Sequence, residues 1–192
     1  SYKDQISIGT AITDFYAAGD VLDNLEQLTS ETVYYGTAKG EEVADYAYNY
    51  KTHDVLGVYS ASTPSTISTY FYGTGEDRAV DAKSTDAMTV SKTFKTTVYA
   101  DIKDLDKTIG WNLQSATYYE GGKGDEVSDY SYNYQVGKTS VKSTSVFFYA
   151  SATGQTGLQR ATSADSDAMM ARSLSYKDQI SIGTAITDFY AA

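Results

Sequence analysis

The chain has 192 residues, a net charge of −10 and a pI of about 4.4, and it contains no cysteine. The negative charge disfavours binding to nucleic-acid phosphates and to anionic membrane surfaces, and the lack of thiols excludes disulfides and thiolate metal sites. No stretch reaches the eighteen or more apolar residues of a membrane helix, so we expect no membrane insertion. No signal peptide is visible and residue 1 is not Met, so we expect a mature or excised segment.

Tyrosine dominates the aromatic residues, with 19 Tyr against 6 Phe and 1 Trp, and there is a single Pro. Aromatic and β-branched side chains pack well on a pleated, half-buried surface. The composition therefore predicts an all-β protein with little or no helix. We expect antiparallel β-hairpins in a meander, stacked into an extended sheet or a sandwich-like repeat unit.

The first predicted element is the segment SYKDQISIGTAITDFYAA, residues 1–18, which recurs without substitution as residues 175–192. Each matched pair is separated by 174 residues, which indicates a repeat of that length. Residues 7–16 have the length and alternation of a donor strand, the kind of strand that one subunit inserts into the sheet of another.

The next element, residues 19–28, has apolar residues spaced as in an amphipathic helix. A second segment, residues 109–119, occupies the corresponding place in a weaker internal repeat. There Ile109, Trp111 and Leu113 alternate as in a strand. Because related halves should adopt the same structure, we favour a strand for both segments.

The internal repeat relates residues 32–50 to residues 116–134, which align without gaps and are identical at eleven of nineteen positions. Residues 69–88 likewise resemble residues 146–169, with a few residues inserted in the second copy. The chain therefore divides into a first half-repeat, a second half-repeat and the start of the next unit, at residues 1–92, 93–174 and 175–192.

Each half contains an aromatic run, a Gly-rich acidic turn and a second run that alternates, as in DYAYNYK, which is typical of a β-hairpin. Tyr46, Tyr48 and Tyr50 are expected on one face of the second run. Gly40 and Gly124 are expected to supply the positive φ that such turns need.

No set of residues predicts catalysis, so we expect no enzyme. His53 is the only histidine, and an exposed loop position is its simplest interpretation. The turn GGKGDEVSD resembles one copy of the RTX calcium nonapeptide, but a β-roll needs that motif in consecutive copies. Asp125, Glu126 and Asp129 are therefore weak Ca²⁺ candidates, and we expect no other cofactor.

The segments YYGTAKGEEVADYAYNYK, YFYGTGEDRAVDAK and YYEGGKGDEVSDYSYNYQ resemble the tyrosine-rich tandem β-repeats of large bacterial surface proteins, of which RHS/YD repeats are the best known. The YD-x-x-G-R core of those repeats is absent here. The resemblance implies a repetitive β architecture with a mainly architectural role, outside the cell or at its surface.

Recurrence at 174 residues admits three interpretations: tandem units joined in one chain, subunits that polymerise by donor-strand exchange, or a duplication without structural consequence. The first predicts a structural subunit or segment of an extracellular fibre or surface array whose partner is itself. A Ca²⁺-dependent or glycan-binding adhesin module is the alternative. The residues expected to join the units are Ile6, Ile8, Ile12, Phe15 and Tyr16 in the first copy and Ile180, Ile182, Ile186, Phe189 and Tyr190 in the second.

Overall fold

The computed structural model describes residues 16–17, 21–22, 27–96, 112–150 and 157–182. Among them no α-helix occurs, which confirms the predicted all-β class; the one helical turn is the 3₁₀ segment η2 (Ala161–Ser163). No helix in these residues has the length and apolar character needed to cross a lipid bilayer.

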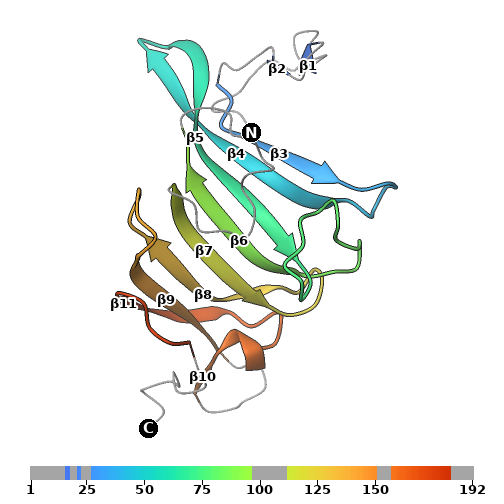
Figure 1. Cartoon of the computed structure of the whole chain (residues 1–192), viewed down its shortest axis with the longest axis vertical. Helices are drawn as coiled ribbons and strands as arrows, with labels where there is room; N and C mark the ends of the chain where they lie inside the picture. Colours follow the sequence, from blue (N-terminus) through green and yellow to red (C-terminus); the bar gives the residue numbers. More distant parts are fainter. Residues whose placement is uncertain (1–15, 18–20, 23–26, 97–111, 151–156, 183–192) are drawn as a thin grey trace.

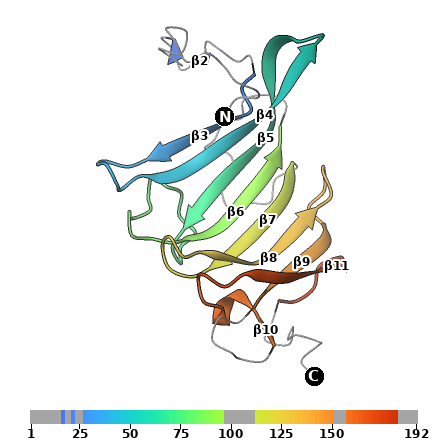
Figure 2. The ribbon, with the colours of Figure 1, turned by 180° about the vertical axis from the view of Figure 1, so that it is seen from behind.

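Nine strands form one antiparallel sheet in the order β10-β9-β8-β7-β6-β5-β4-β3, with β11 also paired to β9. They follow one another as a meander, with β3 and β11 on opposite sides of the sheet (Figures 1 and 2). A separate two-stranded ribbon joins β1 to β2. The bounds are β1 (Tyr16–Ala17), β2 (Val21–Leu22), β3 (Ser30–Tyr35), β4 (Val43–Val55), β5 (Val58–Tyr72), β6 (Met88–Lys95), β7 (Leu113–Glu120), β8 (Val127–Tyr134), β9 (Val141–Ala150), β10 (Leu158–Gln159) and β11 (Met170–Lys177).

The turns use glycine as the sequence predicts. Gly40, between β3 and β4, and Gly124, between β7 and β8, have φ values of 89° and 86°. Each of these amides donates a hydrogen bond to the carboxylate two residues later, Glu42 at 2.6 Å and Glu126 at 2.9 Å. The two acidic turns therefore have the same local construction.

One face of the sheet carries the main core. Tyr48 and Tyr50 of β4 are buried there with Ile67, Phe94 and Leu113, and Tyr46 packs against them. The alternation of DYAYNYK thus places the three tyrosines of β4 in one cluster, as expected. Phe71 and Phe148 are the largest side chains with essentially no exposed surface.

Two successive strand pairs of the first half recur in the second half with the same register. Tyr46 lies opposite Thr69 where β4 pairs with β5, and its counterpart Tyr130 lies opposite Val146 where β8 pairs with β9. Each of these ladders also has a bulge at the same place, after Asn49 in β4 and after its counterpart in β8. The next pair, β5 with β6, corresponds in the same way to β9 with β11. The four strands β3 to β6 therefore correspond to β7, β8, β9 and β11.

The gapless alignment of residues 32–50 with 116–134 is wrong before the turn. Where β3 pairs with β4, Val33 lies opposite Tyr46; where β7 pairs with β8, Tyr118 lies opposite Tyr130. The counterpart of a β3 residue is thus 85 positions later, whereas that of a β4 residue is 84 positions later. The turn explains the difference, since residues 36–42 connect the first hairpin and only residues 121–126 connect the second.

This shift makes Leu28 the counterpart of Leu113, and both are buried, at 4% and 0% exposure. Leu28 forms an isolated bridge and Leu113 begins β7, while Val21–Leu22 form β2. Residues 23–26 and Trp111 lie outside the described residues. The described parts of both segments therefore contain strand or bridge residues, as favoured over a helix.

The predicted division at residues 1–92, 93–174 and 175–192 stays a prediction. The first boundary falls inside β6 and the second inside β11. Both boundaries therefore cut equivalent strands, and a unit counted from β3 to β11 describes the sheet more naturally.

Candidate functional site

Most residues expected to join successive units lie outside the described part of the chain: Ile6, Ile8, Ile12, Phe15, Ile186, Phe189 and Tyr190. Tyr16 lies in the two-residue strand β1. Ile180 and Ile182 are described, so only the second copy of the repeated segment can be followed in detail.

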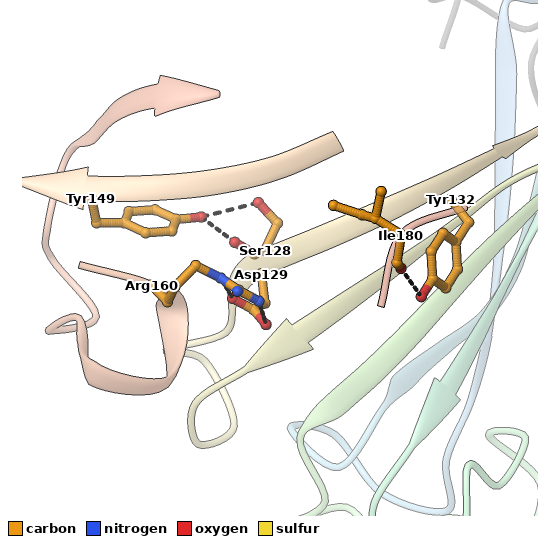
Figure 3. A network of polar contacts seen from close by, with 6 residues as sticks. All are labelled: Ser128, Asp129, Tyr132, Tyr149, Arg160 and Ile180. Carbon is orange, nitrogen blue, oxygen red and sulfur yellow. Dashed lines mark hydrogen bonds and ion pairs between the residues drawn. The ribbon is translucent and has the colours of Figure 1, made fainter. Parts of the chain in front are cut away.

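The second copy begins inside a strand, because Ser175, Tyr176 and Lys177 are the last residues of β11. The chain then turns at Asp178, whose φ is 61°. From there it crosses β8 and β9. The Ile180 amide donates to Thr144 Oγ1 at 3.2 Å. The Tyr132 hydroxyl donates to the Ile180 carbonyl at 3.4 Å (Figure 3).

The donor strand expected at residues 7–16 corresponds to residues 181–190 in this copy, of which only Ser181 and Ile182 are described, so it stays a prediction. Residues 178–182, which precede and begin it, do not form a strand. Apart from the Asp178 amide, which donates to the Lys142 carbonyl, the described contacts of this backbone are with the side chains of Thr144 and Tyr132. Ile180 and Ile182 are half-buried and line a depression with Tyr130 and Tyr132. The isoleucines therefore cover a face of the sheet and do not extend its edge.

Tyr149 of β9 pairs with β10 on one side and with β11 on the other, so β10 lies on the β8 side of β9, beyond the last residue that β8 pairs. The two edges of the sheet are therefore β3 and β11, and among the described residues no strand pairs with the outer side of either. The exposure of β11 alternates, with Arg172, Leu174 and Tyr176 half-buried and their neighbours exposed. The corresponding residues of β6 are buried because β7 covers the outer side of that strand. In the part of the chain that the structure describes, β11 thus repeats β6 without a strand on its outer side.

The backbone of β6 shows which amides point outward. The Thr96 amide donates to the carbonyl of Ser65, a residue of β5, at 3.1 Å. The amide of the adjacent Lys95 points the other way and donates to the carbonyl of Asn112, the residue before β7, at 2.7 Å. Since amides alternate along an antiparallel strand, that of Thr93 also points towards β7. In β11 the counterpart of Thr93 is Ser175, whose amide therefore points away from β9.

A buried ion pair holds the loop after β9 against β8. The Arg160 guanidinium binds Asp129, with Nε 2.7 Å from Oδ1, and the two side chains are only 14% and 5% exposed. Beside them the Tyr149 hydroxyl donates to the Ser128 carbonyl at 2.6 Å (Figure 3). Asp129 lies at the bulge of β8, where the ladder with β7 skips one residue.

The first half contains the same arrangement. Arg78 binds Asp45 at 2.9 Å, and the Tyr72 hydroxyl donates to the Ala44 carbonyl at 2.6 Å. Asp45 also occupies the residue skipped by the ladder, here between β3 and β4. We call each Arg–Asp–Tyr group a clamp. The clamp residues are identical in both aligned halves, and this signal could have identified them from the sequence.

The weak Ca²⁺ candidates have protein partners instead of a shared cavity. Asp129 belongs to the clamp, and Glu126 accepts hydrogen bonds from the amides of Gly124 and Met88. Asp125 is exposed on the turn. Within the described ranges no group of three or more His, Asp or Glu side chains could hold a metal ion.

A tyrosine cluster covers the junction between β7 and β8. Tyr118 and Tyr130 stack at 4.4 Å between ring centroids, and both meet Tyr132 edge-on. Burial raises the pKa of Tyr118 to about 12, with a smaller contribution from the neighbouring Tyr134. Burial also raises the pKa of Tyr130. These hydroxyls stay protonated at physiological pH, so the cluster has a packing role.

His53 is a half-buried residue of strand β4, so the exposed loop position expected for it is wrong. Its Nε2 lies 3.0 Å from Thr63 Oγ1 of β5, across the β4–β5 hairpin. No protein-family model, curated protein or solved structure matches this chain.

Proposed function

We propose that this protein is a structural β-repeat module that assembles with further copies of itself into an extended sheet. The observation that carries the proposal is the fusion of two equivalent four-strand halves through β6 and β7. The β6–β7 pairing is therefore a side-by-side junction between two copies of the repeat within one molecule. The outer edges of the molecule are β11, which corresponds to β6, and β3, which corresponds to β7.

Two further features support a structural role. The charge of −10 and the acidic turns favour a soluble surface, and in each clamp the largely buried aspartate is paired with an arginine. The proposal includes a place in an extracellular fibre or surface array, in keeping with the resemblance to tyrosine-rich surface repeats. It also includes tandem units in one chain, because residues 175–192 repeat residues 1–18.

The test compares two proline variants at equivalent positions. In Ser175→Pro the lost amide points outward, so the sheet should fold and growth at β11 should stop, since proline is tolerated where its missing N–H faces away from the ladder. In Thr93→Pro the same change removes an amide inside the β6–β7 junction, and the protein should be strongly destabilised.

Assembly is measured by sedimentation velocity and electron microscopy over a range of concentrations, and folding by circular dichroism. The unchanged chain should form larger species as concentration rises, while the folded Ser175→Pro variant stays smaller. A two-unit chain, in which residues 19–192 follow Ala192 once more, should scatter X-rays as one elongated particle. If the single chain stays monomeric and the two-unit chain behaves as two independently tumbling bodies, the proposed function is wrong.

A further inference from the structure

We infer that β11 of one copy pairs antiparallel with β3 of a second copy, in the register in which β6 pairs with β7. This inference rests on the proposed function and specifies its contact to the residue. The β6–β7 junction serves as the template, and each partner strand can be matched to one template strand.

The first match is between β11 and β6. Val90 of β6 lies opposite Phe71, and Arg172 of β11 lies opposite Phe148, the counterpart of Phe71. The register shift that follows in β5–β6 also recurs in β9–β11. β11 therefore presents its outer side as β6 does.

The chain also leaves the two strands in the same way. The amide of Thr96, just after β6, donates to the Ser65 carbonyl at 3.1 Å. The amide of Asp178, just after β11, donates to the Lys142 carbonyl at 3.0 Å, and Lys142 is the counterpart of Ser65. Both connections thus begin from equivalent backbone positions.

The second match is between β3 and β7, established by their pairing with β4 and β8 and by the buried pair Leu28 and Leu113. In the template Lys92 lies opposite Ala116, and Ser91 lies opposite Thr117. Transferred to the edges, this register places Leu174 opposite Glu31 and Ser173 opposite Thr32.

The side chains of β11 suit burial at such a junction. Val90, Lys92 and Phe94 of β6 are 1%, 5% and 2% exposed. Their counterparts Arg172, Leu174 and Tyr176 are half-buried. Covering Leu174 and the ring of Tyr176 would remove apolar surface from water, which favours pairing.

The charges at the two edges are also complementary. β11 contains Arg172 and Lys177, whereas β3 contains Glu31 and is followed by the acidic turn with Glu41 and Glu42. In the template register Arg172 is diagonal to Glu31 on the same face, about 7–8 Å away and within reach of a long side chain. A β11–β11 pairing would instead bring like charges together.

The connection is long enough to make this junction within one chain. Residues 96–112, 17 residues, connect β6 to Leu113. Lys177 corresponds to Lys3 in the terminal repeat, so residues 4–27, 24 residues, would connect β11 to Leu28 of the next unit. Both connections would join the ends of two neighbouring strands. The 24-residue connection can therefore cover any distance that the 17-residue connection covers.

Cysteine pairs test this register, because the chain contains no native cysteine. Chains with Ser173→Cys are mixed with chains with Thr32→Cys and treated with a thiol reagent that spans about 5–6 Å, the Cα separation of a hydrogen-bonded antiparallel pair. The same two changes are made in the two-unit chain, Ser173→Cys in the first unit and Thr32→Cys in the second. Both positions are exposed in the single unit.

Two controls accompany the experiment. Ser91→Cys with Thr117→Cys in one chain should cross-link internally, because these residues are opposite each other in the template. Val33→Cys in place of Thr32→Cys should lose the cross-link, because a shift of one residue moves the side chain to the other face.

A cross-link between Ser173→Cys and Thr32→Cys, absent with Val33→Cys, is the expected result in the mixed chains, the two-unit chain or both. If neither cross-links while the internal control does, the register is wrong. Cross-linked dimers from Ser173→Cys chains alone would also overturn it, because they would show β11–β11 pairing. If assemblies still form in sedimentation and microscopy in those cases, the proposed function stands and only this contact fails.

Discussion

The clamp of the second half permits a quantitative test of what holds the loop after β9. In Asp129→Ala the carboxylate is removed and the Arg160 guanidinium, whose side chain is 14% exposed, stays in place without its partner. Breaking a buried pair in this way costs about 3–5 kcal/mol, because a charge is left buried and uncompensated. The free energy of unfolding should fall by that amount.

Urea denaturation followed by circular dichroism measures the loss. With a slope of about 2–3 kcal/mol per molar urea, the midpoint should fall by roughly 1–2.5 M. Asp125→Ala is the matched control, because this aspartate is exposed on the adjacent turn and its replacement should change stability by no more than about 0.5 kcal/mol.

A double variant separates the ion pair from the packing around it. Asp129→Leu with Arg160→Met replaces both charges by apolar groups, and its stability should be close to that of the unchanged protein or higher. A loss of less than about 1 kcal/mol in Asp129→Ala would refute the reasoning, because the pair would then be worth no more than an exposed one.

Three further predictions concern the tyrosine cluster, the second acidic turn and the core. The pKa of Tyr118 is raised from 10.0 to about 12 in the folded state, so its contribution to stability is complete below pH 10 and is lost as the pH rises towards 12. The difference in absorbance at 295 nm between the unchanged chain and Tyr118→Phe isolates this group from the other tyrosines and should appear together with unfolding in circular dichroism; a difference that appears near pH 10 without unfolding would contradict the burial. Gly121→Ala should cost about 1–3 kcal/mol, because φ is 117° and the new Cβ would meet the Asp125 carbonyl, while Gly122→Ala should have little effect in the same melting experiment. Phe71→Ala should lower the free energy of unfolding by about 3–5 kcal/mol in urea, and a loss under 1 kcal/mol would mean that the site collapses around the smaller side chain.

The sequence was sufficient to predict the fold class and the hairpins because both depend on local patterns. Alternation in DYAYNYK and glycines in the acidic turns specify strands and turns within a few residues. The internal repeat also indicated which segments correspond. The gapless alignment missed the one-residue shift before the turn, because it matches Tyr34 and Tyr35 with the adjacent tyrosines Tyr118 and Tyr119. The shifted alignment needs a gap in the turn, but it makes Leu28, Ser30, Thr32 and Tyr34 identical to Leu113, Ser115, Thr117 and Tyr119.

The expected strand joint depends on contacts between distant segments, and it stays a prediction because most of its residues lie outside the described part of the chain. At Ile180 and Ile182 the alternation suits a strand, but Asp178 adopts a positive φ and the chain turns onto the face of β8 and β9. The clamps could have been predicted in part, because Asp45 and Arg78 have identical counterparts. Their burial and their place at a bulge required the three-dimensional structure.

The even number of strands in each half determines what kind of polymer such a sheet could form. With four antiparallel strands per half, β3 and β11 run in opposite directions. The β11 edge of one molecule can therefore pair antiparallel with the β3 edge of another that has the same orientation. A contact between unlike edges is head-to-tail, so it closes no two-fold dimer and leaves a filament with two chemically different ends. Growth and termination at those ends would then need separate control.

Twist adds a second consequence. Neighbouring strands rotate by about 20–25°, so the eight strands of one unit turn the sheet by roughly 160–200°. In such a filament the same face of the sheet would then lie on nearly opposite sides in successive units, and its orientation would repeat about once every two units.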